Sequence, residues 1–283
     1  MTIKTVGIIG AGTMGNGIAQ ACAVAGIDAL MLDVNPAALD KGITTISGSL
    51  DRLLKKEKIT AEQKAAAMAH VKTTSTMADL ARCDYVIEAA TENESLKIKI
   101  LKDLDALLPA STIIATNTSS ISITQLAAAT SRPDRFIGMH FFNPVPMMAL
   151  VELIRGLATS DATLATAQDL AKALGKTPIT VRNSPGFVVN RILCPMINEA
   201  IFCLQEGLAT AEDIDNGMKL GTNQPIGPLA LADMIGLDVM IAVMNVFYEG
   251  FNDPKYRPAP LLKEMVAAGY LGRKTGRGFY TYG

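Results

Sequence analysis

The chain of 283 residues has few of the side chains that build metal centres and disulfide scaffolds. It contains only two histidines, His70 and His140, and its four cysteines are widely spaced without a Cys-x-x-Cys pair. Because zinc sites need clustered cysteine and histidine ligands, we expect no metal site. Scattered cysteines indicate buried free thiols in a reducing compartment, so we expect a cytoplasmic protein.

The chain also has almost no net charge, −1 at pH 7. Nucleic acids and anionic membranes attract strongly basic proteins, so we expect neither as a main partner. The one long uncharged run, residues 5–27, contains six glycines, which disfavour a membrane span or signal peptide. We interpret this run as a buried strand, a glycine turn and a helix made of small residues.

Short apolar runs alternate with helical stretches over the first two thirds of the chain. Runs that are apolar throughout are typical of strands covered on both faces. The predicted strands are Val6–Ile9, Ala29–Leu32, Val71–Thr73, Tyr85–Ala89, Ile113–Thr116, Phe136–Met139, Val151–Ile154 and Ile179–Val181. The alternation predicts an α/β fold with a doubly wound, Rossmann-type parallel sheet.

The pattern changes at Asn183-Ser184-Pro185-Gly186, where we place a domain boundary. Residues 1–184 form the predicted sheet domain, and residues 185–283 form an all-helical C-terminal domain. We expect helices over 187–207, 210–219, 228–249 and 259–268, with one candidate strand at Phe279–Tyr282. Residues 234–247 hold more apolar side chains than one helix face needs, which indicates either a subunit interface or a central helix.

A Gly-x-Gly-x-x-Gly motif follows the first predicted strand directly and opens the next helix. In this context glycines allow a tight turn and close approach of a pyrophosphate to helix N-terminal amides. The residues expected to contact a dinucleotide here are Gly10, Gly12, Thr13, Met14 and Gly15. The alternative interpretation is a fortuitous glycine turn.

The second predicted strand is followed at once by Asp33, which indicates the type of dinucleotide. An acidic side chain at this place hydrogen-bonds the ribose hydroxyls of NAD and repels a 2′-phosphate. No arginine follows at residues 34–36 to hold such a phosphate. We therefore expect NAD as the cofactor.

His140 lies near the carboxyl edge of a predicted strand, and Glu152 lies in the next extended run. A histidine that takes a hydroxyl proton and a carboxylate that orients its ring suit hydride-transfer chemistry. The spacing alone favours the alternative of a buried structural histidine and a surface glutamate.

Three further groups of polar residues occur at positions where ligands bind in this class of fold. Asn117 and Ser119 follow a predicted strand, where they can bind substrate or nicotinamide, although the segment can also cap the next helix. Asn190 lies in an apolar helix and needs a polar partner. Lys56 belongs to a basic helix end that is either solvated or a cradle for a polyanion.

Blocks spread over the whole chain together resemble the (S)-3-hydroxyacyl-CoA dehydrogenase family, in particular its short, monofunctional bacterial members. The blocks are GIIGAGTMGNGIAQ, NTSSISITQLA, HFFNPVPMMALVELI, NSPGFVVNRI, GPLALADMIGLD and GRKTGRGFYTYG. The resemblance implies NAD-dependent interconversion of (S)-3-hydroxybutyryl-CoA and acetoacetyl-CoA, and a homodimer formed through the helical domain. The chain lacks the length for the hydratase domain of the multifunctional relatives.

The resemblance also assigns roles residue by residue. His140 and Glu152 match the catalytic pair, and Ser119 and Asn190 match residues that contact the reacting oxygen of the substrate. Positions that match the cofactor site are Asp33, Glu92, Lys97, Asn143 and Lys274. Ser49 and Lys56 match positions that contact the CoA portion.

Two other functions are consistent with parts of this pattern. One is a two-domain NAD-linked dehydrogenase of a hydroxy acid or sugar acid without CoA, although such enzymes commonly use a catalytic lysine. The other is a non-enzymatic NAD-binding or sensing protein. Turnover with acetoacetyl-CoA distinguishes the two dehydrogenases, and NADH binding without NADH oxidation would indicate the sensing protein.

Overall fold

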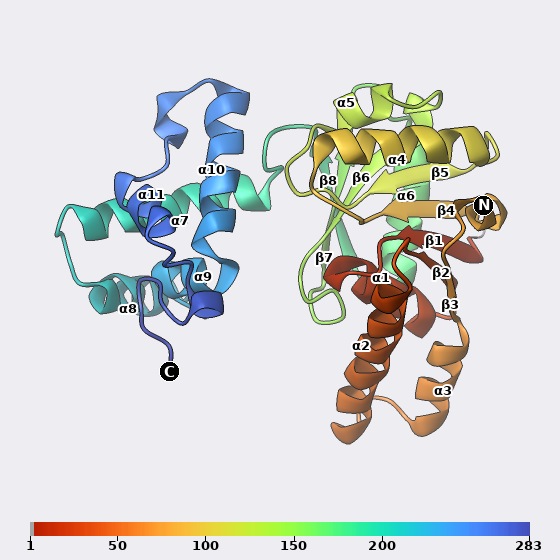
Figure 1. Ribbon diagram of the computed structural model, residues 1–283, viewed down its shortest axis with the longest axis horizontal. Helices are drawn as coiled ribbons and strands as arrows, with labels where there is room; N and C mark the ends of the chain where they lie inside the picture. The colour runs from red at the N-terminus through yellow and green to blue at the C-terminus, as the bar shows by residue number, and fades with distance from the viewer. Residues whose placement is uncertain (1–2) are drawn as a thin grey trace. The chain divides into compact units, whose positions relative to one another are not determined.

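The computed structural model describes residues 3–283, which divide into two compact units between Ser184 and Pro185. The first unit is built on one eight-stranded sheet with the order β3-β2-β1-β4-β5-β6-β7-β8 (Figure 1). The strands are β1 (Thr5–Ile9), β2 (Asp28–Leu32), β3 (Val71–Thr74), β4 (Tyr85–Glu88), β5 (Ile113–Thr116), β6 (Phe136–Phe141), β7 (Leu150–Arg155) and β8 (Thr177–Arg182). All eight coincide with predicted strands to within a few residues at each end.

The parallel sheet predicted from the sequence is confirmed for β1 to β6. In contrast, β7 pairs antiparallel with β6, and β8 runs parallel to β7, so the last two strands point the opposite way. A parallel connection needs a crossover of a dozen or more residues. Residues 142–149 form only turns, so β7 must return antiparallel to β6.

Helices cover both faces of this sheet, as expected for a doubly wound fold. One face shares a core with α1 (Thr13–Val24), α2 (Pro36–Lys55), α3 (Ala61–Ala69) and α6 (Asp161–Ala173). The other face carries η1 (Met77–Arg82), α4 (Glu94–Leu107) and α5 (Ile123–Ala128) (Figure 1). Gly138 of β6 faces α5, where a Cβ would lie 2.8 Å from the Ile123 side chain.

Helix starts in the first unit follow the capping chemistry that the sequence indicates. The Asn35 side chain accepts a hydrogen bond from Ala37 N at the start of α2, and Thr60 and Gln63 form a reciprocal capping box at α3. The start of α1 differs, because Gly12 has no side chain to cap it and no acid lies in the first turn. Its amides therefore remain suited to an anion.

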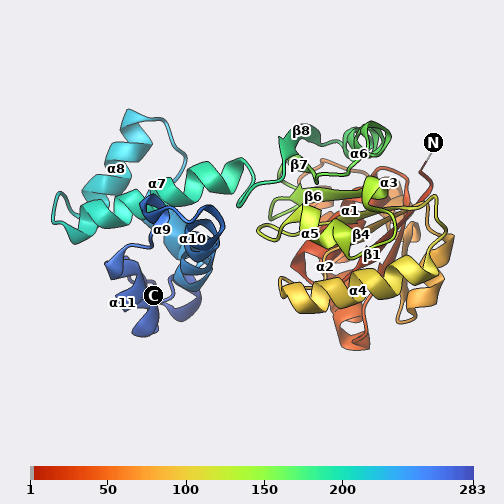
Figure 2. The same ribbon diagram turned by 90° about the horizontal axis from the view of Figure 1, so that it is seen from above.

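The second unit is helical, with α7 (Val189–Gln205) packed against α9 (Pro228–Ile235), α10 (Leu237–Phe251) and α11 (Pro260–Ala267) (Figure 2). Another helix, α8 (Ala211–Gly221), packs on α9. A second hydrophobic core holds these helices together and includes Ile197, Leu229, Met244 and Phe247.

The single helix predicted over residues 228–249 is wrong, because the structure breaks it into α9 and α10 with a bend of 99°. Gly236 lies at the break with φ of 104°, a conformation that favours glycine. Over residues 3–283 no single helix is long and apolar enough to cross a bilayer. Only this bent pair reaches that length and composition, and only when its two helices are taken together.

The strand predicted at Phe279–Tyr282 is also wrong. The buried carboxylate of Asp233 accepts hydrogen bonds from the Phe279 and Tyr280 amides, both at 3.0 Å, and from the Tyr282 hydroxyl at 3.0 Å. These donors bind a side chain instead of a neighbouring strand, so the tail remains irregular apart from isolated bridges.

The cysteines are unpaired, and Cys22, Cys83 and Cys194 are buried. Burial raises the pKa of the Cys22 thiol to about 12. A thiol in this environment stays protonated and unreactive at neutral pH, so we assign Cys22 a packing role.

Candidate active site

The turn between β1 and α1 is shaped by glycines that have different tasks. Gly10 has φ of 99°, and a Cβ there would lie 2.7 Å from the Ala89 carbonyl oxygen at the end of β4. A Cβ on Gly15 would lie only 1.8 Å from the Gly10 carbonyl oxygen. A Cβ on Gly12, in contrast, would meet no protein atom within 4 Å. Gly10 and Gly15 are thus needed for packing, whereas Gly12 keeps open space in front of the α1 amides.

Asp33 lies beside this turn, directly after β2. Its Oδ2 accepts a hydrogen bond from Ala11 N at 2.9 Å, and its Oδ1 accepts one from Asn35 N at 3.0 Å. These bonds hold the carboxylate against the glycine turn, and each oxygen keeps a lone pair for a ribose hydroxyl. The uncapped helix start, the open space at Gly12 and the fixed carboxylate together fit a dinucleotide such as NAD.

The turn lies at the switch point of the sheet, where chain order reverses between β1 and β4. Ligands of doubly wound sheets bind at such a crevice, outside the carboxyl ends of the strands. The same edge carries the ends of β4, β5 and β6. Glu92, Asn117, Ser119 and His140 therefore lie on the side of the sheet that binds ligands.

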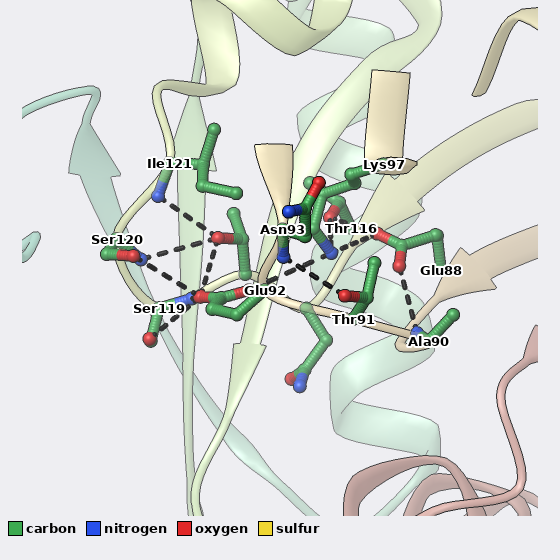
Figure 3. A network of polar contacts seen from close by, with 12 residues as sticks. Glu88, Ala90, Thr91, Glu92, Asn93, Lys97, Thr116, Ser119, Ser120 and Ile121 are labelled. Carbon is green, nitrogen blue, oxygen red and sulfur yellow. Dashed lines mark hydrogen bonds and ion pairs between the residues drawn. The ribbon is translucent and has the colours of Figure 1, made fainter. Parts of the chain in front are cut away.

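A polar network joins the ends of β4 and β5 (Figure 3). Oε1 of Glu92 accepts hydrogen bonds from Ser119 N at 2.6 Å, from Ser119 Oγ at 2.9 Å and from Thr118 Oγ1 at 2.8 Å. Thr118 Oγ1 in turn accepts a bond from Ile121 N at 3.0 Å. One carboxylate oxygen thus organises the segment that carries Ser119.

Lys97, from the first turn of α4, lies beneath this segment with only 1% of its side chain exposed. Its ammonium forms an ion pair with Glu88 and lies 3.8 Å from Glu92 Oε2. A buried ammonium needs such compensation by opposite charge. The structure brings together Lys97 and Glu92, which the family resemblance assigns to the cofactor site, and adds Glu88, which the sequence analysis did not single out.

Asn117 connects this network to β6. Its side-chain oxygen accepts a hydrogen bond from Phe141 N at 2.8 Å, and its backbone N–H donates to the Glu88 backbone carbonyl oxygen at 2.8 Å. The side chain is mostly buried. Asn117 therefore aligns the end of β5 with the residue that follows His140.

His140 and Glu152 are direct cross-strand partners in the antiparallel pair of β6 and β7. His140 Nδ1 lies 2.8 Å from Glu152 Oε2, with Glu152 fully buried and His140 nearly so. The Phe142 ring packs 4.5 Å from the imidazole centre. A carboxylate bound to Nδ1 fixes the imidazole orientation and directs proton exchange to Nε2.

A pocket of about 660 Å³ lies in the first unit between α1, α2 and the segment after β6. It brings Ser49 and Lys56 of the predicted CoA contacts together with Thr13 and Asn143 of the predicted cofactor contacts. Arg52 and Lys58, which the sequence analysis did not select, add two more cations to the lining. The spacing of Ser49, Arg52 and Lys56 places them on one face of a helix.

The pocket wall formed by residues 143–147 is held in place by Lys176. Its ammonium donates to the Val145 carbonyl oxygen at 2.6 Å and to the Met148 carbonyl oxygen at 2.9 Å. Burial lowers the pKa of Lys176. This segment has no helix or strand of its own, so these bonds replace the missing secondary structure.

Two predicted site residues belong to the second unit and are not among those that the first unit brings together. Asn190 lies in the first turn of α7 and is half-buried. Lys274 lies in η4 (Arg273–Thr275) and pairs with Asp238 at the start of α10. Over residues 3–283, no group of three or more metal-ligating side chains occurs.

Family profiles match both units. The profile described as "3-hydroxyacyl-CoA dehydrogenase, NAD binding domain" matches residues 5–184, and the profile of the C-terminal domain of the same family matches residues 186–282. The chain belongs to the 3-hydroxyacyl-CoA dehydrogenase family. Membership identifies the chain as an NAD-dependent dehydrogenase.

Individual relatives are similar to this dehydrogenase in sequence and structure over nearly its whole length. A curated 3-hydroxybutyryl-CoA dehydrogenase from Bradyrhizobium diazoefficiens is 54% identical over 99% of this chain and 96% of its own length. The crystal structure of (S)-3-hydroxybutyryl-CoA dehydrogenase from Ralstonia eutropha is 68% identical, with a TM-score of 0.98 and full coverage of both chains. A solved diketoreductase at 32% identity has a TM-score of 0.86.

Proposed function

We propose that the chain interconverts (S)-3-hydroxybutyryl-CoA and acetoacetyl-CoA with NAD as the hydride carrier. The contact of 2.8 Å between His140 Nδ1 and Glu152 Oε2, at the same edge of the sheet as the glycine turn, carries this proposal. The names of the relatives at 54% and 68% identity support the choice of substrate.

His140 removes the proton of the 3-hydroxyl through Nε2 and returns it in the reductive direction. Glu152 stabilises the imidazolium that forms and keeps the ring in place. When bound, NAD accepts the hydride from C3 of the substrate or supplies it in reverse. Ser119 and Asn190 hold the reacting oxygen, so that the geometry is set before transfer. We assign Asn143 and Lys274 to the cofactor site as well.

The test of the function is NADH oxidation with acetoacetyl-CoA, compared with free acetoacetate and with a diketone. Fast turnover of the thioester alone supports the proposal. Preference for a substrate without CoA favours the alternative of a non-CoA dehydrogenase, since a diketoreductase shares the fold. Cofactor binding without any turnover indicates a sensing protein.

We assign the CoA portion to the pocket that contains Ser49 and Lys56, where three cations face an apolar lining. Lys56→Ala should raise KM for acetoacetyl-CoA by about two- to tenfold, the effect of one partly exposed charge contact. KM for a short thioester without the nucleotide should not change. Lys55→Ala is the matched control, because Lys55 is exposed on the same helix and does not line the pocket. Equal effects on KM for both substrates would show that Lys56 does not contact the nucleotide portion and is only a solvated residue at the helix end.

The carboxylate of Asp33 should make the enzyme prefer NADH to NADPH, because it binds ribose hydroxyls and repels a 2′-phosphate. Asp33→Ser should narrow this preference, and Asp33→Ser combined with Asn35→Arg should reverse it by supplying a phosphate partner. Steady-state kinetics with both cofactors measure the ratio of kcat/KM. Equal use of NADPH by the unmodified enzyme would contradict the role of Asp33.

The proposal includes a homodimer formed through the helical unit and a cytoplasmic location. Met234, Val239 and Tyr248 are each at least 44% exposed, although they lie on the apolar helices α9 and α10. Burying such side chains against a second copy is favourable. Light scattering measures the mass in solution, and Val239→Glu should shift it towards the monomer.

A further inference from the structure

Glu88, the last residue of β4, is a carboxylate with no exposed surface. Its Oε1 accepts a hydrogen bond from Ala90 N at 2.9 Å, and its Oε2 accepts one from Thr116 Oγ1 at 2.7 Å. The same Oε2 forms the ion pair with Lys97. Burying a carboxylate fully carries a large desolvation penalty, so its presence at this edge of the sheet indicates a specific task.

Lys97 links Glu88 to the segment that carries Ser119. Its ammonium lies between two carboxylates, in contact with Glu88 and 3.8 Å from Glu92 Oε2 (Figure 3). Glu92 itself is 45% exposed, and within residues 3–283 its Oε2 has no other partner than Lys97. The buried cation attracts Oε2 and thereby leaves Oε1 for Thr118 and Ser119.

We propose that Glu88 is a positioning residue for the reaction: it anchors Lys97 beside Glu92, and Glu92 in turn holds the amide and hydroxyl of Ser119. Ser119 is the residue that meets the reacting oxygen in the proposed function, so this inference depends on that function for its catalytic consequence. Its structural consequence, the ordering of residues 118–121, stands independently.

Neutralising Glu88 should redirect the charge of Lys97. Glu88→Gln keeps the size of the side chain and an oxygen for Ala90 N, but it leaves Glu92 as the nearby carboxylate partner of the ammonium. Lys97 is then drawn towards Glu92 and competes with Ser119 and Thr118 for its oxygens. We expect a displaced Ser119 in a folded protein.

The first measurement is hydrogen exchange of residues 118–121 in the protein without cofactor or substrate. The Ser119 and Ile121 amides are bonded to Glu92 and Thr118, so their exchange reports on this segment directly. Glu88→Gln should accelerate their exchange by about tenfold. Asp105→Asn is the control. Asp105 lies on the same helix as Lys97, α4, but at its opposite end, where it pairs with Arg132. The control substitution should leave this exchange unchanged.

The second measurement is the kinetic coupling of Glu88 and Lys97 with acetoacetyl-CoA and NADH. Glu88→Gln should lower kcat by about tenfold in an otherwise unmodified enzyme. In the Lys97→Met background the same substitution should have no further effect, because the anchored cation is already gone. We measure kcat at saturating NADH and titrate NADH affinity separately, because Lys97 and Glu92 match positions of the cofactor site.

Each possible outcome of these experiments has a defined meaning. Unchanged exchange of residues 118–121 in Glu88→Gln overturns the inference, and so do independent, multiplicative effects of the two substitutions on kcat. If the unmodified enzyme does not turn over acetoacetyl-CoA, the proposed function fails, and the exchange data alone decide whether Glu88 positions the segment. If Glu88→Gln does not fold, Thr116→Val replaces it, because this substitution removes one hydrogen-bond donor to Glu88. It should accelerate exchange of residues 118–121 and lower kcat in the same direction, by smaller factors.

Discussion

His140→Asn should lower kcat for acetoacetyl-CoA reduction by about 10²–10⁴-fold, the usual cost of losing a positioned acid–base group. Asparagine retains a polar side chain at this position on β6 but exchanges no proton at neutral pH. NADH affinity should stay close to that of the unmodified enzyme, because the glycine turn and Asp33 lie on other strands. Steady-state kinetics and NADH fluorescence titration measure the two quantities.

The second histidine provides the matched control for this experiment. His70 pairs with Asp28 at 2.7 Å on the surface of the same unit, away from the carboxyl ends of the strands. His70→Asn should therefore leave kcat unchanged. Near-normal turnover by His140→Asn would show that His140 is not the acid–base group, even if the protein is a dehydrogenase.

Gly15→Ala should destabilise the first unit by at least about 3 kcal/mol, because the new Cβ meets a backbone oxygen that no side-chain rotation can clear. The overlap with the Gly10 carbonyl oxygen, at 1.8 Å, outweighs the gain of about 1 kcal/mol in helix propensity from glycine to alanine. Thermal unfolding measures the loss, which should appear with or without cofactor.

Gly12→Ala is the matched substitution three residues away, with the opposite expected outcome. The added Cβ meets no protein atom within 4 Å, and the backbone at this residue is extended. The free energy of unfolding should therefore change by less than about 1 kcal/mol. NADH affinity should nevertheless fall at least about tenfold, or 1.4 kcal/mol, because the methyl occupies the space for the pyrophosphate. Full NADH affinity in Gly12→Ala would place the dinucleotide elsewhere.

The sequence predicts local structure well where a backbone or ligand geometry requires one particular residue type. The glycine turn and the acidic residue after β2 both belong to this class. The His140 and Glu152 pairing was predicted as a possibility of two extended segments and a turn. Its geometry depends on β7 running antiparallel to β6, which periodicity does not reveal.

Features that depend on distant buried acids could not be predicted. Asp233 collects the amides of Phe279 and Tyr280, 46 and 47 residues away, and thereby prevents the predicted strand. In the sequence Glu88 lies within the predicted strand Tyr85–Ala89, and only the structure shows its buried ion pair with Lys97. The one available signal was an acidic residue closing the run Tyr85–Ile87, followed by a lysine nine residues later.

The position of the proposed catalytic pair in a β-ladder has a consequence for specificity. The register of β6 against β7 fixes the contact between His140 and Glu152, whereas residues 143–147, which line the pocket, lie outside the ladder. Substitutions at residues 144–147 should alter ligand recognition without changing the register of His140 against Glu152. Solved relatives at 32% and 34% identity that are named for other substrates keep TM-scores of 0.86 and 0.82. The ladder register therefore constrains the proposed catalytic pair, and the connection between the two strands lies outside that constraint.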